Sequence, residues 1–116
     1  MNINGTVRLK AFETTIKWFV GDFKEFLKKY MLQDGELEDD AIGLTLVCKR
    51  CHLIYSDGAD NNNTIPYEVV HAITRMCQHR DILFNDTNPE MIAYLVGYVS
   101  GKILDKLNSN KNPPLN

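Results

Sequence analysis

Two cysteines, Cys48 and Cys51, are separated by only two residues in a stretch rich in strand-forming side chains. A C-x2-C step at a tight turn directs two thiolates toward one point, which is half of a tetrahedral zinc site. The third cysteine and a histidine follow within thirty residues and provide candidates for the other half. The predicted ligands of one structural zinc ion per chain are Cys48, Cys51, Cys77 and His79.

The second half of this site depends on where the helix around Cys77 ends. Residues two apart on a regular helix point in nearly opposite directions, so Cys77 and His79 both bind the ion only if the helix ends at Cys77. His71 is an alternative ligand, but the helical phase places Cys77 inward and His71 outward, which favours His79. The competing interpretation is that Cys77 is a small buried hydrophobic residue, as most free cysteines are.

The predicted ligands need a hairpin and a helix to position them. Alternating apolar residues around the C-x2-C step predict a β-hairpin over residues 42–55. A polar loop rich in Asp and Asn follows at residues 57–63, which we interpret as a solvated turn and not as a calcium loop. A helix is expected over residues 65–78, with Thr64 as its N-cap and Pro66 in its first turn.

The arrangement of these elements resembles a small zinc finger of the ββα or C2HC kind over residues 44–79. The resemblance rests on strand, C-x2-C turn, strand, loop and a helix that carries Cys77 and His79. It implies a structural metal ion. Three features depart from such fingers: 25 residues separate Cys51 from Cys77, one residue separates Cys77 from His79, and His52 occupies the position of a common glycine.

Two more helices are expected outside this region. Large apolar residues recur in steps of three and four from Leu9 to Tyr30, which predicts an amphipathic N-terminal helix. A last helix is expected over residues 89–107, where Gly97 and Gly101 would let the first helix approach closely. The large apolar residues of the N-terminal stripe are Leu9, Phe12, Ile16, Phe19, Phe23, Phe26 and Tyr30.

These elements predict an α+β fold in which the N-terminal helix precedes the short hairpin and the two later helices. With 116 residues, of which 44% are hydrophobic, the chain is expected to form a single domain over residues 1–107. Residues 42–79 form its zinc-finger-like part, and residues 108–116 form a flexible tail.

Charge and motif content bound the function. The net charge of -2 disfavours a general electrostatic grip on nucleic acid, and no phosphate loop, nucleophile elbow or H-E-x2-H motif occurs. We therefore expect a non-enzymatic, zinc-stabilised adaptor that binds another protein. An Asn- and Lys-rich composition of this kind would suit an accessory or viral-type protein.

Two alternatives use the same hairpin. A nucleic-acid-binding regulator would use Lys49 and Arg50 at the turn, with Lys28 and Lys29 nearby. A thiol oxidoreductase would use the C-x2-C step, but redox motifs of this type open a helix, whereas Cys51 runs into a strand.

The expected surroundings follow from the same composition. The start of the chain lacks a basic, apolar signal, and the longest apolar run, residues 91–96, is too short to span a membrane. We expect a reducing, cytoplasmic location and no membrane partner. A homo-oligomer would form through the predicted helix from Leu9 to Tyr30.

Overall fold

The computed structural model describes residues 2–32, 42–48, 51–79 and 89–111, without the side chains of Cys48, Asn110 and Lys111. Within these ranges a four-stranded sheet and three α-helices are formed, which confirms the α+β class. The elements in chain order are β1 (Ile3–Leu9), the short 3-10 turn η1 (Lys10–Phe12), β2 (Thr14–Val20), α1 (Phe23–Lys29), β3 (Gly43–Cys48), β4 (Cys51–Ser56), α2 (Asn61–His79) and α3 (Pro89–Lys111).

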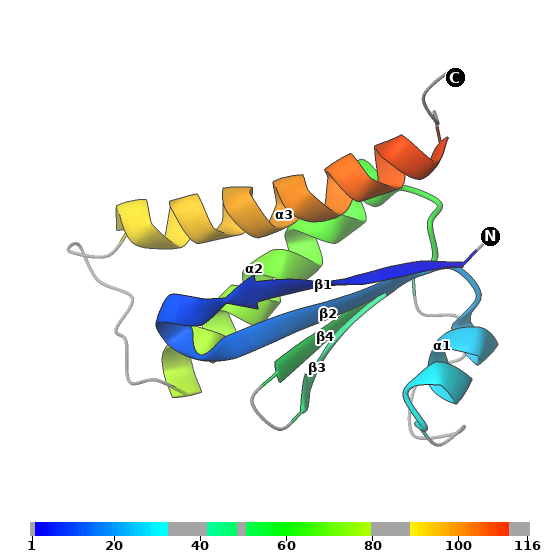
Figure 1. Cartoon of the computed structure of the whole chain (residues 1–116), viewed down its shortest axis with the longest axis horizontal. Helices are drawn as coiled ribbons and strands as arrows, with labels where there is room; N and C mark the ends of the chain where they lie inside the picture. The colour runs from blue at the N-terminus through cyan, green and yellow to red at the C-terminus, as the bar shows by residue number, and fades with distance from the viewer. Residues whose placement is uncertain (1, 33–41, 49–50, 80–88, 112–116) are drawn as a thin grey trace.

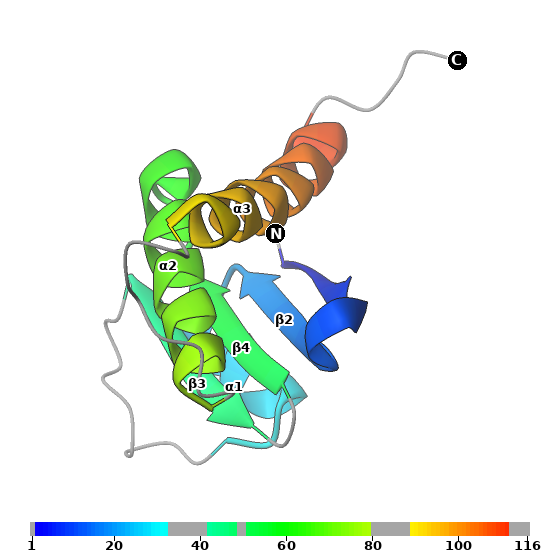
Figure 2. The same ribbon diagram turned by 90° about the vertical axis from the view of Figure 1, so that its left-hand side faces the viewer.

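The sheet has the strand order β1-β2-β4-β3. Its two outer pairs are antiparallel, whereas the central pair β2 and β4 is parallel, so both central strands end at the same edge. Helices α2 and α3 cover one face of this sheet (Figures 1 and 2), which we call the two-helix face. The opposite face, called the α1 face, is covered by α1 where β2 and β4 end.

Each face of the sheet has its own hydrophobic core. Because side chains alternate along a strand, Trp18 and Ile54 face the two-helix side, whereas Phe19 and Tyr55 face α1. The buried residues of the larger core on the two-helix face are Val7, Leu9, Ile16, Trp18, Val20, Ile54, Ile65, Val69, Ala72, Ile73, Met76, Cys77, Leu95, Val99, Ile103 and Leu107. The smaller core contains Phe19, Phe23, Phe26, Leu27, Leu53 and Tyr55.

The predicted helix from Leu9 to Tyr30 is wrong, because most of this segment forms β1, η1 and β2, and only Phe23–Lys29 is α-helical. Its aromatic residues recur at helical spacing, yet Trp18 and Phe19 are both buried, in cores on opposite faces of a strand. A tight turn reverses the chain at Glu13, whose φ of 49° is in the left-handed region. The oligomer expected through this helix therefore loses its structural basis.

The predicted hairpin over residues 42–55 is confirmed by β3 and β4, whose register places Cys48 opposite Cys51. The following helix is also confirmed, but it begins at Asn61, so Thr64 is not its N-cap and Pro66 lies inside it. Asp60 takes the capping role, since its backbone carbonyl accepts hydrogen bonds from the amides of Asn63 and Thr64.

The last helix is confirmed from Pro89 and continues to Lys111, beyond the expected end near residue 107. The predicted close packing at Gly97 and Gly101 is wrong, because an added Cβ at either glycine would meet nothing within 4 Å. The main contacts of this helix are with α2 and β1. No helix in the described part of the chain is both long enough and apolar enough to cross a membrane.

Candidate functional site

The C-x2-C step lies where the hairpin turns. Cys51, the first residue of β4, is 8% exposed and takes part in a disulfide bond. Cys48 is its partner in the β3–β4 register, although the Cys48 side chain lies outside the described part of the structure. A disulfide at Cys51 differs from the free thiolates that the zinc prediction assumes for this turn.

The third cysteine occupies a different environment. Cys77 is a free thiol that is fully buried in the core of the two-helix face, and burial raises its pKa. Cys51 alternates in phase with Leu53 and Tyr55, which belong to the core on the α1 face. The structure therefore places Cys51 and Cys77 on opposite faces of the sheet.

The histidines show a separate arrangement. His79, the last residue of α2, lies beside His52 of β4, with 6.0 Å between the ring centroids. His71, the alternative ligand, is exposed and packs edge-on against Tyr67. His52 occupies the position of a common glycine in the zinc fingers that the sequence resembles. Only the tertiary structure shows that it lies beside His79, a predicted ligand.

Within the described ranges, no group of three or more His, Cys, Asp or Glu side chains is placed to hold a metal ion. The Cys48 side chain is not among those described. The zinc ion bound by Cys48, Cys51, Cys77 and His79 stays a prediction.

Polar contacts hold β3 against α2 next to the histidines. The Thr45 hydroxyl lies 2.7 Å from Oε1 of the buried Glu68, and an Arg75 guanidinium nitrogen donates to the Thr45 carbonyl oxygen at 2.7 Å. An added Cβ at Gly43 would lie 2.8 Å from Glu68 Oε2 and from Thr64 Cγ2. A glycine at this position therefore permits the close approach of β3 to α2.

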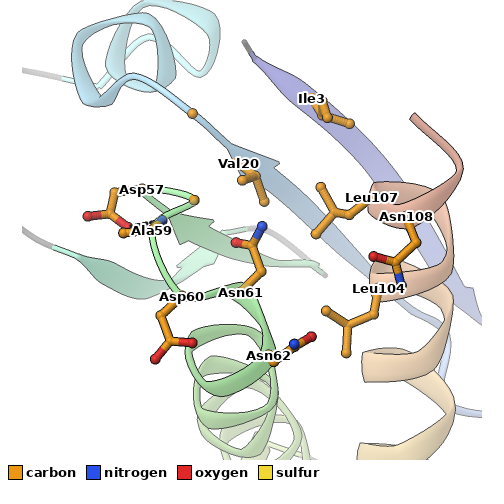
Figure 3. Close-up of a pocket in the computed structure, with 12 residues that line it drawn as sticks. Ile3, Val20, Asp57, Ala59, Asp60, Asn61, Asn62, Leu104, Leu107 and Asn108 are labelled. Atoms are coloured by element: carbon orange, nitrogen blue, oxygen red, sulfur yellow. Dashed lines mark hydrogen bonds between the residues drawn. The ribbon is translucent and has the colours of Figure 1, made fainter. Parts of the chain in front are cut away.

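A pocket of about 610 Å³ lies at the edge of the sheet where β2 and β4 both end. In parallel sheets, ligands commonly bind outside the carboxyl ends of the strands. Figure 3 shows Asp57 and Asp60 on one side of this pocket, Leu104 and Leu107 of α3 on the other, and Asn61 between them. The complete lining consists of Ile3, Val20, Gly21, Asp57, Gly58, Ala59, Asp60, Asn61, Asn62, Leu104, Leu107 and Asn108.

The loop between β4 and α2 shapes the polar rim of the pocket. The Asp57 carboxylate accepts a hydrogen bond from the Ala59 amide at 2.9 Å, and Asp60 accepts one from the Asn63 side chain at 2.8 Å. Gly58 permits the turn, because its φ is 91°. Each of these two hydrogen bonds involves only one of the two oxygen atoms of the Asp57 or Asp60 carboxylate.

Sequence reasoning missed this pocket because it treated residues 57–63 as a solvated turn. The available signal was a buried strand followed by an Asp-Gly turn and a helix start. That signal places the loop at a strand end, but it does not show that β2 ends beside it. Comparison of the chain with known protein families, curated proteins and solved structures found no match.

Proposed function

We propose that this protein is a non-enzymatic module that binds another protein by accepting a lysine or arginine side chain in the pocket at the β2 and β4 strand ends. The supporting observation is an apolar floor beside a rim with two carboxylates. The floor is formed by Ile3, Val20, Leu104 and Leu107. The carboxylates belong to Asp57 and Asp60.

Lysine and arginine match this combination of surfaces. Their aliphatic stems pack on apolar side chains while the charged group stays in a polar, hydrated environment. In the pocket, the stem would lie between Val20 and Leu107, and the cation would lie toward the loop that carries Asp57 and Asp60, whose carboxylates would have to turn toward it (Figure 3). Among the described lining residues there is no cationic side chain to oppose it.

The amide groups in the lining support recognition of a peptide segment. Asn61, Asn62 and Asn108 each carry both a hydrogen-bond donor and an acceptor. The Asn61 carbonyl oxygen accepts a hydrogen bond from the Ser56 hydroxyl at 3.0 Å, which orients this amide. Amides and carboxylates can bind a basic side chain and the adjacent backbone without a reactive nucleophile.

Selection of peptides from a random display library on the immobilised protein tests this proposal and requires no candidate partner. We expect enrichment of peptides with a central lysine or arginine. Their binding should weaken by about tenfold in an Asp57→Asn, Asp60→Asn variant, because a charge-assisted contact at the rim is worth about 1.5 kcal/mol or more.

Asp105→Asn is the matched control, because it removes an exposed carboxylate of α3 that does not line the pocket. Binding by this control should equal that of the wild type. Selection of acidic or purely apolar peptides, or equal binding by the Asp57→Asn, Asp60→Asn variant, would exclude the pocket as a receptor for basic side chains.

One observation favours nucleic-acid binding as a second candidate function. Arg8 and Lys17 are exposed residues of β1 and β2 on the α1 face, toward the end of the sheet where β3 and β4 are joined. Fluorescence polarisation with labelled single-stranded DNA and RNA tests this function. Affinity that falls with increasing salt and with Lys17→Gln would support it; absence of binding at low salt would exclude it.

A further inference from the structure

The strongest unassigned cluster is the pair of imidazoles that joins β4 to the end of α2. The rings of His52 and His79 are 6.0 Å apart between centroids and are tilted by 37°. His52 is 3% exposed, and its Nδ1 atom is buried without a hydrogen-bond partner among the described residues. A buried polar atom without a partner destabilises a fold, so a ligand at this atom would relieve that cost.

The two imidazoles have a separation that suits a shared metal ion. Zinc–nitrogen bonds are about 2.1 Å long, which holds the centres of two imidazoles on one ion about 5–6 Å apart. His79 is exposed at the helix end, so its ring can adjust toward His52. Binding of one ion between the two rings therefore requires only a small movement of the exposed His79 side chain.

The surroundings of His52 include one opposing charge. Burial, followed by the nearby His79 and Arg75, lowers the pKa of His52. Arg75 keeps its positive charge while its guanidinium donates to the Thr45 carbonyl oxygen at 2.7 Å. A metal ion beside His52 therefore has to gain more from the imidazole nitrogens than it loses to this charge.

We infer that His52 and His79 form a two-histidine site for a divalent transition-metal ion of the zinc type, with water at the remaining coordination positions. Of the four ligands predicted from the sequence, this site keeps His79. A ring nitrogen of His52 takes the place of the three cysteine sulfur atoms. It lies on the two-helix face, because His52 alternates in phase with Ile54. It would link the start of β4 to the end of α2.

Isothermal titration of the full chain with zinc chloride, without reductant, tests the site. Wild type should bind one zinc ion per chain, and His79→Gln should weaken binding at least about tenfold. Because His79 is exposed, this variant should keep the wild-type far-ultraviolet circular dichroism spectrum. The matched control is His71→Gln, which removes the remaining histidine of the chain, also exposed on α2, and should bind zinc like the wild type.

Two further variants separate this site from the cysteine-based one. His52→Gln should lose zinc binding, and Cys77→Ala should retain it. If His52→Gln fails to fold, nuclear magnetic resonance of the histidine rings in the wild type replaces it, and zinc should shift the signals of His52 and His79 but not His71. Absence of zinc binding by the wild type, unchanged binding by His79→Gln, or loss of binding in folded Cys77→Ala would overturn the two-histidine site.

Discussion

The hydroxyl group of Tyr55 allows the structure to be tested through the pH dependence of stability. Tyr55 is 1% exposed, lies in the core of the α1 face, and donates a hydrogen bond to the Gly21 carbonyl oxygen at 2.7 Å. Its ring packs against Phe26 with 4.6 Å between centroids. Tyr55→Phe removes the hydrogen bond and keeps the ring, so we expect a loss of about 1 kcal/mol in the free energy of unfolding at pH 7.

The same hydroxyl predicts a second effect in alkaline solution. Burial, followed by the negative charges of Asp57 and Asp22, raises the pKa of Tyr55 to about 12. Since an unfolded tyrosine has a pKa of about 10, the unfolded chain loses this proton first as the pH rises. The contribution of Tyr55 is therefore complete below pH ~10 and declines between pH ~10 and ~12, by about 2–3 kcal/mol in total.

Tyr55→Phe cannot lose this proton, so its free energy of unfolding should fall less steeply above pH ~10. The variant should be less stable than wild type at pH 7, equal to it near pH ~11, and more stable above that pH. Urea unfolding followed by circular dichroism at a series of pH values measures these differences.

Tyr94→Phe is the control, because Tyr94 is 69% exposed and should leave both the stability and its pH dependence unchanged. A difference between Tyr55→Phe and wild type that stays constant from pH 7 to pH ~11.5 would refute the reasoning. Equal stability of the two proteins at pH 7 would contradict a net stabilising contribution from the hydrogen bond to Gly21.

Three further predictions concern stability and use urea unfolding as the measurement. Gly97→Ala and Gly101→Ala should each stabilise the protein by about 0.5–1 kcal/mol, because alanine favours a helix and its Cβ meets open space; destabilisation would reveal a neighbour at this surface. Gly5→Ala should destabilise by about 1–3 kcal/mol and change the fluorescence of Trp18, since the new Cβ would lie 2.8 Å from the buried indole; an unchanged midpoint would contradict this packing. Asp22→Ala should cost about 1 kcal/mol, since the carboxylate caps α1 by accepting from the Glu25 amide at 3.1 Å; no loss would mean that the cap is not formed.

Local sequence signals were sufficient to predict the strands and helices in the second half of the chain. The C-x2-C turn between alternating apolar residues predicted the hairpin, and the helices expected over residues 65–78 and 89–107 are confirmed by α2 and α3. The same reasoning failed from Leu9 to Tyr30, where large apolar residues fall at helical spacing. Residues buried on both faces of a central strand hide the two-residue alternation that would have identified it.

The candidate sites were even harder to recognise from the sequence, because the fold brings their residues together. The strand β4 was predictable, but only its parallel pairing with β2 creates the shared edge where Asp57 and Asp60 adjoin the apolar floor. In the same way, the pattern singled out His79 as a ligand, yet 26 intervening positions separate it from His52. Neither proximity follows from spacing along the chain.

The amino-acid sequence by itself determined the α+β class, the hairpin, the two long helices and the residues capable of metal or ionic chemistry, because these depend on neighbours a few positions away. The tertiary structure decided which face of the sheet each side chain occupies. A shift of one residue along a strand reverses that face. For this reason Cys51 and Cys77 lie on opposite sides of the sheet, while His52 and His79 meet on one side.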